Sequence, residues 1–224
     1  MVWRKKAAVA LAGGLFGFVA VAAGSGLHAR FLGNAAVEIT DGTFTVLTDF
    51  PYQSGAFGYM TYDPALVAPR PHSVCLFTHA HADHFEPDLV ARIGCSVVGP
   101  ASVESRARGV KVIPLAAKIR LAPMTITPVR TSHGSEEHDS YLVEWNGLRL
   151  YFTGDTDDLA ELRGQRRLDA LFITPWLLAR ARAAGALPAA KKLVIYHHRD
   201  GERVDGCETC IVPRQGQMVE IPAR

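Results

Sequence analysis

The sequence predicts a single α/β domain in which short strands alternate with short helices. Two observations lead to this prediction. Apolar, strand-like runs bounded by Gly, Asp and Asn alternate with segments that have the apolar spacing of a helix. No linker is long enough to divide the body of the chain. The 224 residues, 48% hydrophobic and 21% charged, suffice for one sizeable core.

The start of the chain has the pattern of a targeting segment rather than of a folded element. Three basic residues at positions 4–6 precede an uncharged, Ala-rich run over residues 7–27, with small residues suited to cleavage after it. An uncleaved anchor is the alternative, because this run is just long enough to span a bilayer. We expect a signal peptide over residues 1–29 and one globular domain over residues 30–224. That domain is expected to be exported: periplasmic, secreted, or membrane-anchored and facing outward.

The charge of the chain argues against a nucleic-acid partner. The net charge is +2, and it falls to −1 when the three basic residues at positions 4–6 are left out. A near-neutral body lacks the basic surface that nucleic-acid binding needs. We therefore expect a small-molecule partner and contact with a membrane only through an uncleaved N-terminal segment. The pattern does not predict an oligomeric state.

Two hairpins are predicted from turn residues between strand-like runs. Residues 35–40 and 43–50 flank Asp41-Gly42, and residues 140–145 and 148–152 flank Asn146-Gly147. Asp-Gly and Asn-Gly favour a type I′ turn, because both central residues of that turn need positive φ. Each hairpin is followed by an Asp near the end of its second strand, at positions 49 and 155.

The remaining elements follow the same reasoning from apolar spacing. The expected strands cover residues 73–78, 96–99, 110–113, 124–129, 170–174 and 192–196. The expected helices cover residues 86–93, 157–162 and 176–184.

Four cysteines remain in the predicted domain. Cys75 and Cys95 lie in apolar runs, where buried free thiols are expected. Cys207 and Cys210 form one C-x-x-C pair without the second pair of a zinc ribbon, which favours a small loop disulfide or no role. Export permits disulfides, but the sequence does not give their pairing.

The segment 78–84 reads Thr-His-Ala-His-Ala-Asp-His and directly follows a predicted buried strand. In extended backbone, residues two apart point the same way, so His79 and His81 can bind one ion. Asp83 and His84 begin the turn into the next helix and face a neighbouring position. Imidazole and carboxylate groups are the ligands of Zn²⁺ and related ions, so the segment predicts a metal site.

Further candidate ligands follow other apolar runs. His133 comes after the run at 124–129, Asp155 lies in Thr-Gly-Asp-Thr, and His197 and His198 follow Leu-Val-Ile-Tyr. Polar side chains at strand ends lie on loops that a rigid scaffold holds in place. We expect these residues to complete the metal site.

His-x-His-x-Asp-His, a later lone His, Gly-Asp-Thr and a final His after a strand together resemble the metallo-β-lactamase superfamily of hydrolases. The resemblance runs from about residue 31 to residue 198. It implies an αββα sandwich of the metallo-β-lactamase type, with two divalent metal ions at one edge of the sheets. Zn²⁺ is the expected ion, with Mn²⁺ or Fe²⁺ as alternatives.

The resemblance also implies the ligands of each ion. His79, His81 and His133 would hold the first ion, and Asp83, His84 and a terminal His would hold the second, with Asp155 bridging both. In the superfamily the last strand commonly ends with two apolar residues, Pro, any residue and His. Set against residues 194–198, that spacing favours His198 over His197, although a strand that ends one residue early would exchange their roles.

The chemistry expected of such a site is hydrolysis. A divalent ion lowers the pKa of bound water from about 15.7 to about 7, and a hydroxide shared by two ions attacks a carbonyl or phosphorus centre. Asp83 would orient that hydroxide, and His138 would face the substrate as a proton donor or else be a solvated loop residue. Asp49 is expected to support a ligand rather than to be one.

These expectations define an exported hydrolase of an ester, lactone or phosphodiester, possessing a site of small positive charge that suits an anionic substrate. The alternative is a non-catalytic exported metal-binding module of the same fold. Asp155 stands where many β-lactamases of this fold have a Cys ligand, which argues against β-lactam hydrolysis. Residues 31–39 look most like the ascorbate-6-phosphate-lactonase-like branch, which usually has His at the position of Asn34, so that branch's substrate is not transferred.

Overall fold

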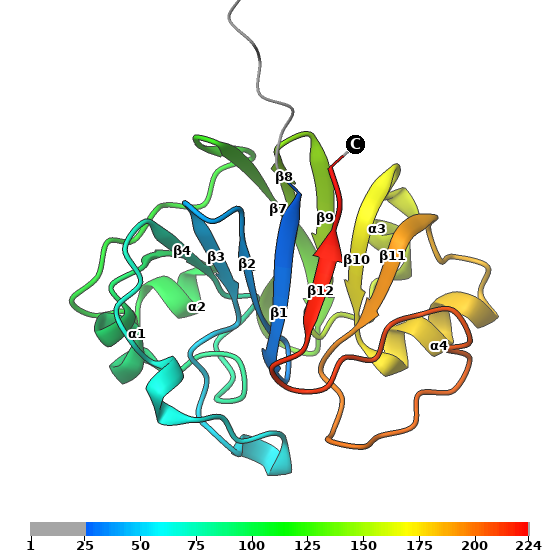
Figure 1. Cartoon of the computed structure of the whole chain (residues 1–224), viewed down its shortest axis with the longest axis horizontal. Helices are drawn as coiled ribbons and strands as arrows, with labels where there is room; N and C mark the ends of the chain where they lie inside the picture. Colours follow the sequence, from blue (N-terminus) through cyan, green and yellow to red (C-terminus); the bar gives the residue numbers. More distant parts are fainter. Residues whose placement is uncertain (1–25, 224) are drawn as a thin grey trace, which may run out of the picture.

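A computed structural model describes residues 26–223 of the chain. Two six-stranded sheets lie face to face, with two helices on the outer side of each sheet (Figure 1). This is the αββα sandwich that the resemblance implied. The helices are α1 (Pro87–Ile93) and α2 (Ala101–Glu104) on one side, and α3 (Leu159–Gly164) and α4 (Pro175–Ala183) on the other.

The first sheet contains the first five strands and the last strand of the described chain, and the second sheet contains the six strands between them. The first sheet has the order β12 (Met218–Ile221), β1 (Leu27–Gly33), β2 (Ala36–Thr40), β3 (Thr45–Thr48), β4 (Ser73–Leu76) and β5 (Ser96–Val98). The second has the order β11 (Ala190–Ile195), β10 (Leu168–Ile173), β9 (Leu148–Phe152), β8 (Glu136–Trp145), β7 (Met124–His133) and β6 (Ile119–Leu121). Two 3₁₀ turns, η1 (Ala56–Gly58) and η2 (Pro64–Leu66), lie between β3 and β4.

The hydrophobic core has three layers. Between the sheets, Phe31 of β1 belongs to the same buried cluster as Trp145 and Phe152 of the second sheet. Val90 of α1 covers the outer face of the first sheet, and Leu177 of α4 covers that of the second. Because full burial of such a side chain contributes roughly 1.5–3 kcal/mol, these layers hold the two sheets and their loops in a fixed relation.

Strand direction brings the candidate ligands to one edge of the sandwich. β3, β4 and β5 are mutually parallel, and so are β9, β10 and β11. β7 runs antiparallel to β8, which runs antiparallel to β9, so β7 ends at the same edge as β9. The loops that follow β3, β4, β7, β9 and β11 therefore meet there, as loops do at the carboxyl ends of parallel strands.

Both predicted hairpins are present, with different turns. Asn146 and Gly147 have φ of 51° and 77°, as a type I′ turn requires. The loop between β2 and β3 is longer than two residues. In it, Asp41 Oδ1 accepts the amide hydrogens of Thr43 and Phe44, each at 2.9 Å. This Asx-type capping replaces the predicted two-residue turn.

Several elements differ from the sequence prediction. Residues 110–113 are not a strand but make one isolated bridge, from Val112 to Val97 of β5. The edge strands β6 and β12, the first strand β1 and the short helix α2 were not predicted. Edge strands of three or four residues carry too little alternation to stand out from loops.

The predicted domain boundary between residues 29 and 30 falls inside β1. Leu27 pairs with Ile221, and Ala29 pairs with both Val219 and Ile39. Leu27 and Ala29 are buried, so β1 includes core residues on both sides of that boundary. The rest of the predicted targeting segment lies outside the described residues. Within the described part of the chain, no helix has the length and apolar character needed to cross a membrane.

The prediction of free buried thiols at Cys75 and Cys95 is wrong. Cys75 of β4 and Cys95, just before β5, form a disulfide with their Cα atoms 5.8 Å apart. The parallel pairing of these neighbouring strands brings the two side chains together under α1. Cys207 and Cys210 form a second disulfide in a loop, which was one of the two alternatives for that pair.

Candidate metal centre

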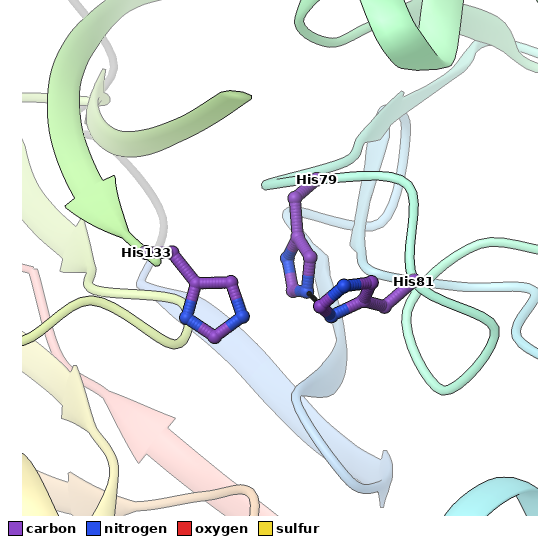
Figure 2. Close-up of side chains that lie close together, drawn as sticks. All are labelled: His79, His81 and His133. Atoms are coloured by element: carbon purple, nitrogen blue, oxygen red, sulfur yellow. Dashed lines mark hydrogen bonds between the residues drawn. The ribbon is translucent and has the colours of Figure 1, made fainter. Parts of the chain in front are cut away.

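Three histidines form the first group of candidate ligands. His79 and His81 lie on the loop after β4, and His133 is the last residue of β7 (Figure 2). The Nε2 atom of His79 lies 2.9 Å from Nδ1 of His81, and the rings of His79 and His133 are 4.7 Å apart. One nitrogen from each of the three residues lies within 4.8 Å of the others. The structure thus brings together the three residues predicted for the first ion.

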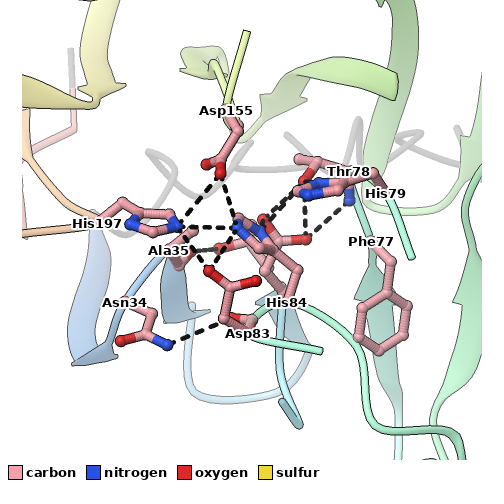
Figure 3. A network of polar contacts seen from close by, with 12 residues as sticks. Asn34, Ala35, Phe77, Thr78, His79, Asp83, His84, Asp155 and His197 are labelled. Carbon is pink, nitrogen blue, oxygen red and sulfur yellow. Dashed lines mark hydrogen bonds and ion pairs between the residues drawn. The ribbon is translucent and has the colours of Figure 1, made fainter. Parts of the chain in front are cut away.

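Asp83, His84, Asp155 and His197 form the second group (Figure 3). The Nε2 atoms of His84 and His197 are 2.9 Å apart. Asp155 Oδ2 lies 3.3 Å and 3.4 Å from these two nitrogens, and Asp83 Oδ2 lies 3.7 Å and 3.3 Å from them. Two carboxylates and two imidazoles therefore converge on one point from three separate loops.

The two groups are adjacent. The ring centroids of His79 and His84, one from each group, are 4.1 Å apart. Asp155 links both, because its backbone carbonyl oxygen accepts a hydrogen bond of 3.0 Å from His133 Nδ1 while its side chain faces His84 and His197. The hydrogen bond leaves Nε2 of His133 free to act as a ligand.

The donor set fits divalent metal ions. Two ligand nitrogens on one tetrahedral zinc ion are about 3.3 Å apart, close to the separation of His84 Nε2 and His197 Nε2. Asp155 Oδ1 is buried and has no hydrogen-bond partner among the described residues. A buried carboxylate oxygen without a donor is costly, and a cation at this place would satisfy it.

The charges around the second group keep its carboxylates in the form that binds metal. Burial opposes ionisation of Asp155, but His84 and His197 hold its pKa well below the usual range. Burial likewise disfavours charge on His84, but Asp155 and Asp49 raise its pKa well above normal. In the first group, burial and the neighbouring His84 lower the pKa of His79, which favours the neutral imidazole that acts as a ligand.

Asp49 supports the ligands from behind, as predicted. It follows β3, is fully buried, and its Oδ2 accepts a hydrogen bond of 3.0 Å from His84 Nδ1. Its Oδ1 accepts the Thr78 amide at 2.7 Å, and the Thr78 hydroxyl lies 3.0 Å from His79 Nδ1. This arrangement fixes the tautomers of His79 and His84 so that both present Nε2 to the metal centre.

The prediction that His198 is the terminal ligand is wrong, because His197 occupies that place. β11 ends at Ile195, and His197 has φ of 54°, so the chain is no longer extended where the alternation was applied. His198 points away: its Nδ1 lies 2.9 Å from the Arg199 carbonyl oxygen, and its Nε2 lies 3.1 Å from that of Pro213. Its ring stacks on Phe31 instead.

The predicted role of His138 as a proton donor to substrate is not supported by its position. His138 is fully buried, its Nε2 accepts the Asp155 amide at 3.0 Å, and its Nδ1 lies 2.8 Å from Thr131 Oγ1. Burial lowers its pKa to about 3. Gly154, with φ of 61°, allows this close approach, because a Cβ there would lie only 2.7 Å from Cε1 of the His138 ring. His138 therefore positions Asp155.

Sequence reasoning missed three residues that surround His197. The carbonyl oxygen of Asn34, between β1 and β2, accepts the His197 amide at 2.6 Å. The rings of Tyr59 and Trp176 lie 4.4 Å and 5.3 Å from the His197 ring. Gly33-Asn34 is a turn signal that could have indicated the positive φ of Asn34, whereas nothing in the sequence marks Tyr59 or Trp176.

Comparisons with known proteins agree with this architecture. A family profile described as "Beta-lactamase superfamily domain" matches residues 28–175. A UPF0173 metal-dependent hydrolase of Thermus thermophilus is 29% identical over 162 residues, which are 64% of this chain and 68% of that protein. A metallo hydrolase of the archaeon Ignicoccus hospitalis is similar in structure, with a TM-score of 0.64 and 14% identity over 89% of this chain and 100% of the other. The metallo-beta-lactamase fold protein YhfI of Bacillus subtilis has a TM-score of 0.64 and 16% identity, covering 88% of this chain and 99% of its own.

Proposed function

The chain belongs to the β-lactamase superfamily, and from that premise we propose that it is an exported hydrolase that uses two metal ions to cleave an ester, lactone or phosphodiester. The observation that carries this proposal is the adjacency of two complete groups of ligands, with His79 and His84 in ring contact at 4.1 Å. One group alone would suit a structural ion. Two adjacent groups suit a pair of ions that act on one bond.

His79, His81 and His133 would hold the first ion, and Asp83, His84 and His197 would hold the second. Asp155, whose buried Oδ1 has no hydrogen-bond partner among the described residues, would contribute to both. The set contains only nitrogen and oxygen donors, which suits Zn²⁺ and also permits Mn²⁺ or Fe²⁺. Divalent ions bound there supply a nucleophile at neutral pH and stabilise the negative charge that develops on the substrate.

The protein's own residues would direct the reaction. Asp83 belongs to the second group, with its Oδ2 3.3 Å from His197 Nε2, and it would also accept a hydrogen bond from the attacking water and so orient it. Asp49 and His138 would keep His84 and Asp155 in place, because both make direct hydrogen bonds to those residues. No side-chain nucleophile is required. The positive charge of the ions favours anionic substrates.

Export is supported by two features. The basic and apolar start of the chain has the pattern of a signal peptide or an uncleaved anchor. The disulfide between Cys75 and Cys95 is of a kind that forms in oxidising compartments and is rare in reducing ones. Within the superfamily, we propose that the chain lies near the ascorbate-6-phosphate-lactonase-like branch, from the pattern of residues 31–39.

The proposal is tested with metal-loaded protein assayed on bis(p-nitrophenyl) phosphate and a panel of lactones and carboxylic esters. Wild-type protein should hydrolyse at least one class, and the His81→Ala variant should lose about 10²-fold or more in kcat/KM. The matched control is His72→Ala, since His72 lies in a surface loop before β4. It should retain full activity.

The alternative is a non-catalytic metal-binding module of the same fold. Metal content measured on the same samples separates the two functions. Full metal content without turnover of any panel member would favour the binding module and contradict the hydrolase. Turnover that requires His81 but not His72 would favour the hydrolase.

A further inference from the structure

An exposed aromatic side chain lies beside the first group of ligands. Phe57 is 68% exposed, and its ring lies 6.5 Å from that of His81. Its φ is 51°, a conformation that is unfavourable for a bulky residue. An apolar ring held at the surface in a strained conformation next to a reactive centre is a recurring feature of ligand-binding loops. Phe57 does not belong to any of the described hydrophobic clusters, so we infer that its function is not to stabilise the core.

A cation lies beside the second group, on the same rim. The guanidinium of Arg199 lies over the ring of Tyr59, 5.0 Å from its centroid, and the Tyr59 and His197 rings pack edge to face with their centroids 4.4 Å apart. The stack fixes the position of Arg199 relative to the ligands, because stacking on an aromatic face limits the rotamers of a long side chain. Tyr59 therefore positions Arg199 next to the reacting centre.

The guanidinium of Arg199 has no acidic partner among the described residues. The carboxylate of Glu202 instead accepts the backbone amide of Arg199, through its Oε2 at 2.7 Å. Arg199 is exposed, so its donors point to solvent. A planar guanidinium with free donors is well suited to a carboxylate or phosphate.

We propose that Phe57, Tyr59 and Arg199 form the substrate-binding rim of the metal centre and select substrates that combine an anionic group with an apolar group. Arg199 would hold a carboxylate or phosphate beside His197, while Phe57 would cover an apolar or aromatic portion beside His81. This inference rests on the proposed hydrolase function, because the rim would hold the substrate whose bond is cleaved at the metal centre. The proposal assigns a substrate class to the metal centre, because the fold alone does not determine the substrate.

Binding of two matched probes to the zinc-loaded protein tests the rim without turnover. The probes are 4-nitrobenzoate, which has both an aromatic ring and a carboxylate, and 4-nitrobenzamide, which is its neutral analogue. Isothermal titration gives the ratio of the two Kd values for wild type, Arg199→Gln and Arg203→Gln. Arg203 is the control because it lies in the same loop, is 94% exposed and pairs only with Asp205.

Arg199→Gln should reduce the preference for the carboxylate at least about fivefold, and Arg203→Gln should leave it within about twofold. Phe57→Ser should weaken both probes to a similar extent, because it removes contact with the shared ring. Equal ratios in the two arginine variants would overturn the proposal, since the preference would then come from the metal ions or from general charge. Zinc content of each variant shows that the centre itself is intact.

A second arm compares kcat/KM for mono-4-nitrophenyl succinate and its neutral methyl ester. Arg199→Gln should act mainly through KM and mainly on the charged ester. An Arg199-dependent binding ratio without turnover of either ester or of any member of the panel of phosphodiester, lactones and esters would contradict the hydrolase function while supporting the rim. Turnover of both esters with no effect of Arg199 would contradict the rim while supporting the hydrolase.

Discussion

The backbone carbonyl oxygen of Asn34 accepts a hydrogen bond of 2.6 Å from the backbone amide of His197, so the turn after β1 holds the last ligand loop. The Asn34 side chain reaches two more loops: its Oδ1 accepts the Met60 amide at 3.0 Å, and its Nδ2 donates to the Asp83 carbonyl oxygen at 3.3 Å. Asn34 is fully buried and has φ of 51°. One residue that binds no metal thus ties three loops of the metal centre together.

Replacing Asn34 with Ala should loosen this arrangement. The variant leaves two buried backbone groups unpaired and places Ala in a left-handed conformation, which should cost about 2–4 kcal/mol of unfolding free energy. The affinity for the second ion should fall about tenfold or more. Urea denaturation and competition with a zinc chelator measure the two effects.

The control for backbone strain is Asn146→Ala, because Asn146 has the same φ of 51° in a hairpin turn away from the ligands. It should lose stability without losing metal affinity. Equal zinc affinities in Asn34→Ala and Asn146→Ala would show that Asn34 does not organise the centre.

Variants of His138 distinguish a role in positioning Asp155 from a role in transferring a proton to substrate. His138→Phe should weaken metal binding, because the Asp155 amide loses the acceptor that it has at 3.0 Å and becomes a buried, unpaired donor at a cost of about 1–3 kcal/mol. His138→Gln should restore much of the affinity, since its side-chain oxygen can accept the same hydrogen bond. The shape of the pH–rate profile should be unchanged in His138→Gln. Loss of one limb of that profile with full metal content would instead identify His138 as a proton donor.

The sequence contains most of the information on ligand identity because ligands occur in local patterns. His79, His81, Asp83 and His84 lie within six residues, and His133 and Asp155 each follow a strong apolar run. The strands that carry them are long or buried enough for their period to be visible, so the edge at which they meet follows from parallel pairing. For the same reason the central strands were predicted more accurately than β6 and β12.

What the sequence could not provide depends on the exact ends of elements and on contacts between distant loops. The sequence predicted His198 as the terminal ligand, whereas the structure places His197 there because β11 ends at Ile195. Strand ends predicted from sequence are uncertain by two or more residues. The role of His138 could not be predicted for a similar reason, because its burial beside Gly154 depends on tertiary packing. The pairing of Cys75 with Cys95 requires knowledge that β4 and β5 are neighbours.

The Cys75–Cys95 disulfide should contribute substantially to stability. It closes a segment with a sequence separation of 20, for which loop-closure entropy predicts about 3 kcal/mol. The Cys75→Ser and Cys95→Ser double variant should show that loss in urea denaturation, and dithiothreitol should reduce the stability of wild type much more than that of the variant, which keeps only the Cys207–Cys210 disulfide among the described cysteines. Removing Cys207 and Cys210, whose separation is only 3, should have a smaller effect. Equal stability of wild type and the Cys75/Cys95 double variant would contradict this.

Processing of the N-terminal segment should spare β1. Leu27 and Ala29 are buried and pair with β12 and β2, so cleavage after Ala29 would remove the start of a core strand. We expect cleavage before Leu27, and intact-mass analysis of protein from the cell envelope measures it. A full-length mass in the membrane fraction would support the anchor, and a full-length mass in the soluble cytoplasmic fraction would contradict export.

The metal content of four purified proteins tests the central claim most directly. Inductively coupled plasma mass spectrometry after zinc loading and removal of excess zinc should find about two ions per chain in wild type and in His198→Ala. His81→Ala and His197→Ala should each retain about one, because each removes a ligand from a different group. A single ion in wild type, or loss of an ion in His198→Ala but not in His197→Ala, would contradict the account of two adjacent metal sites completed by His197.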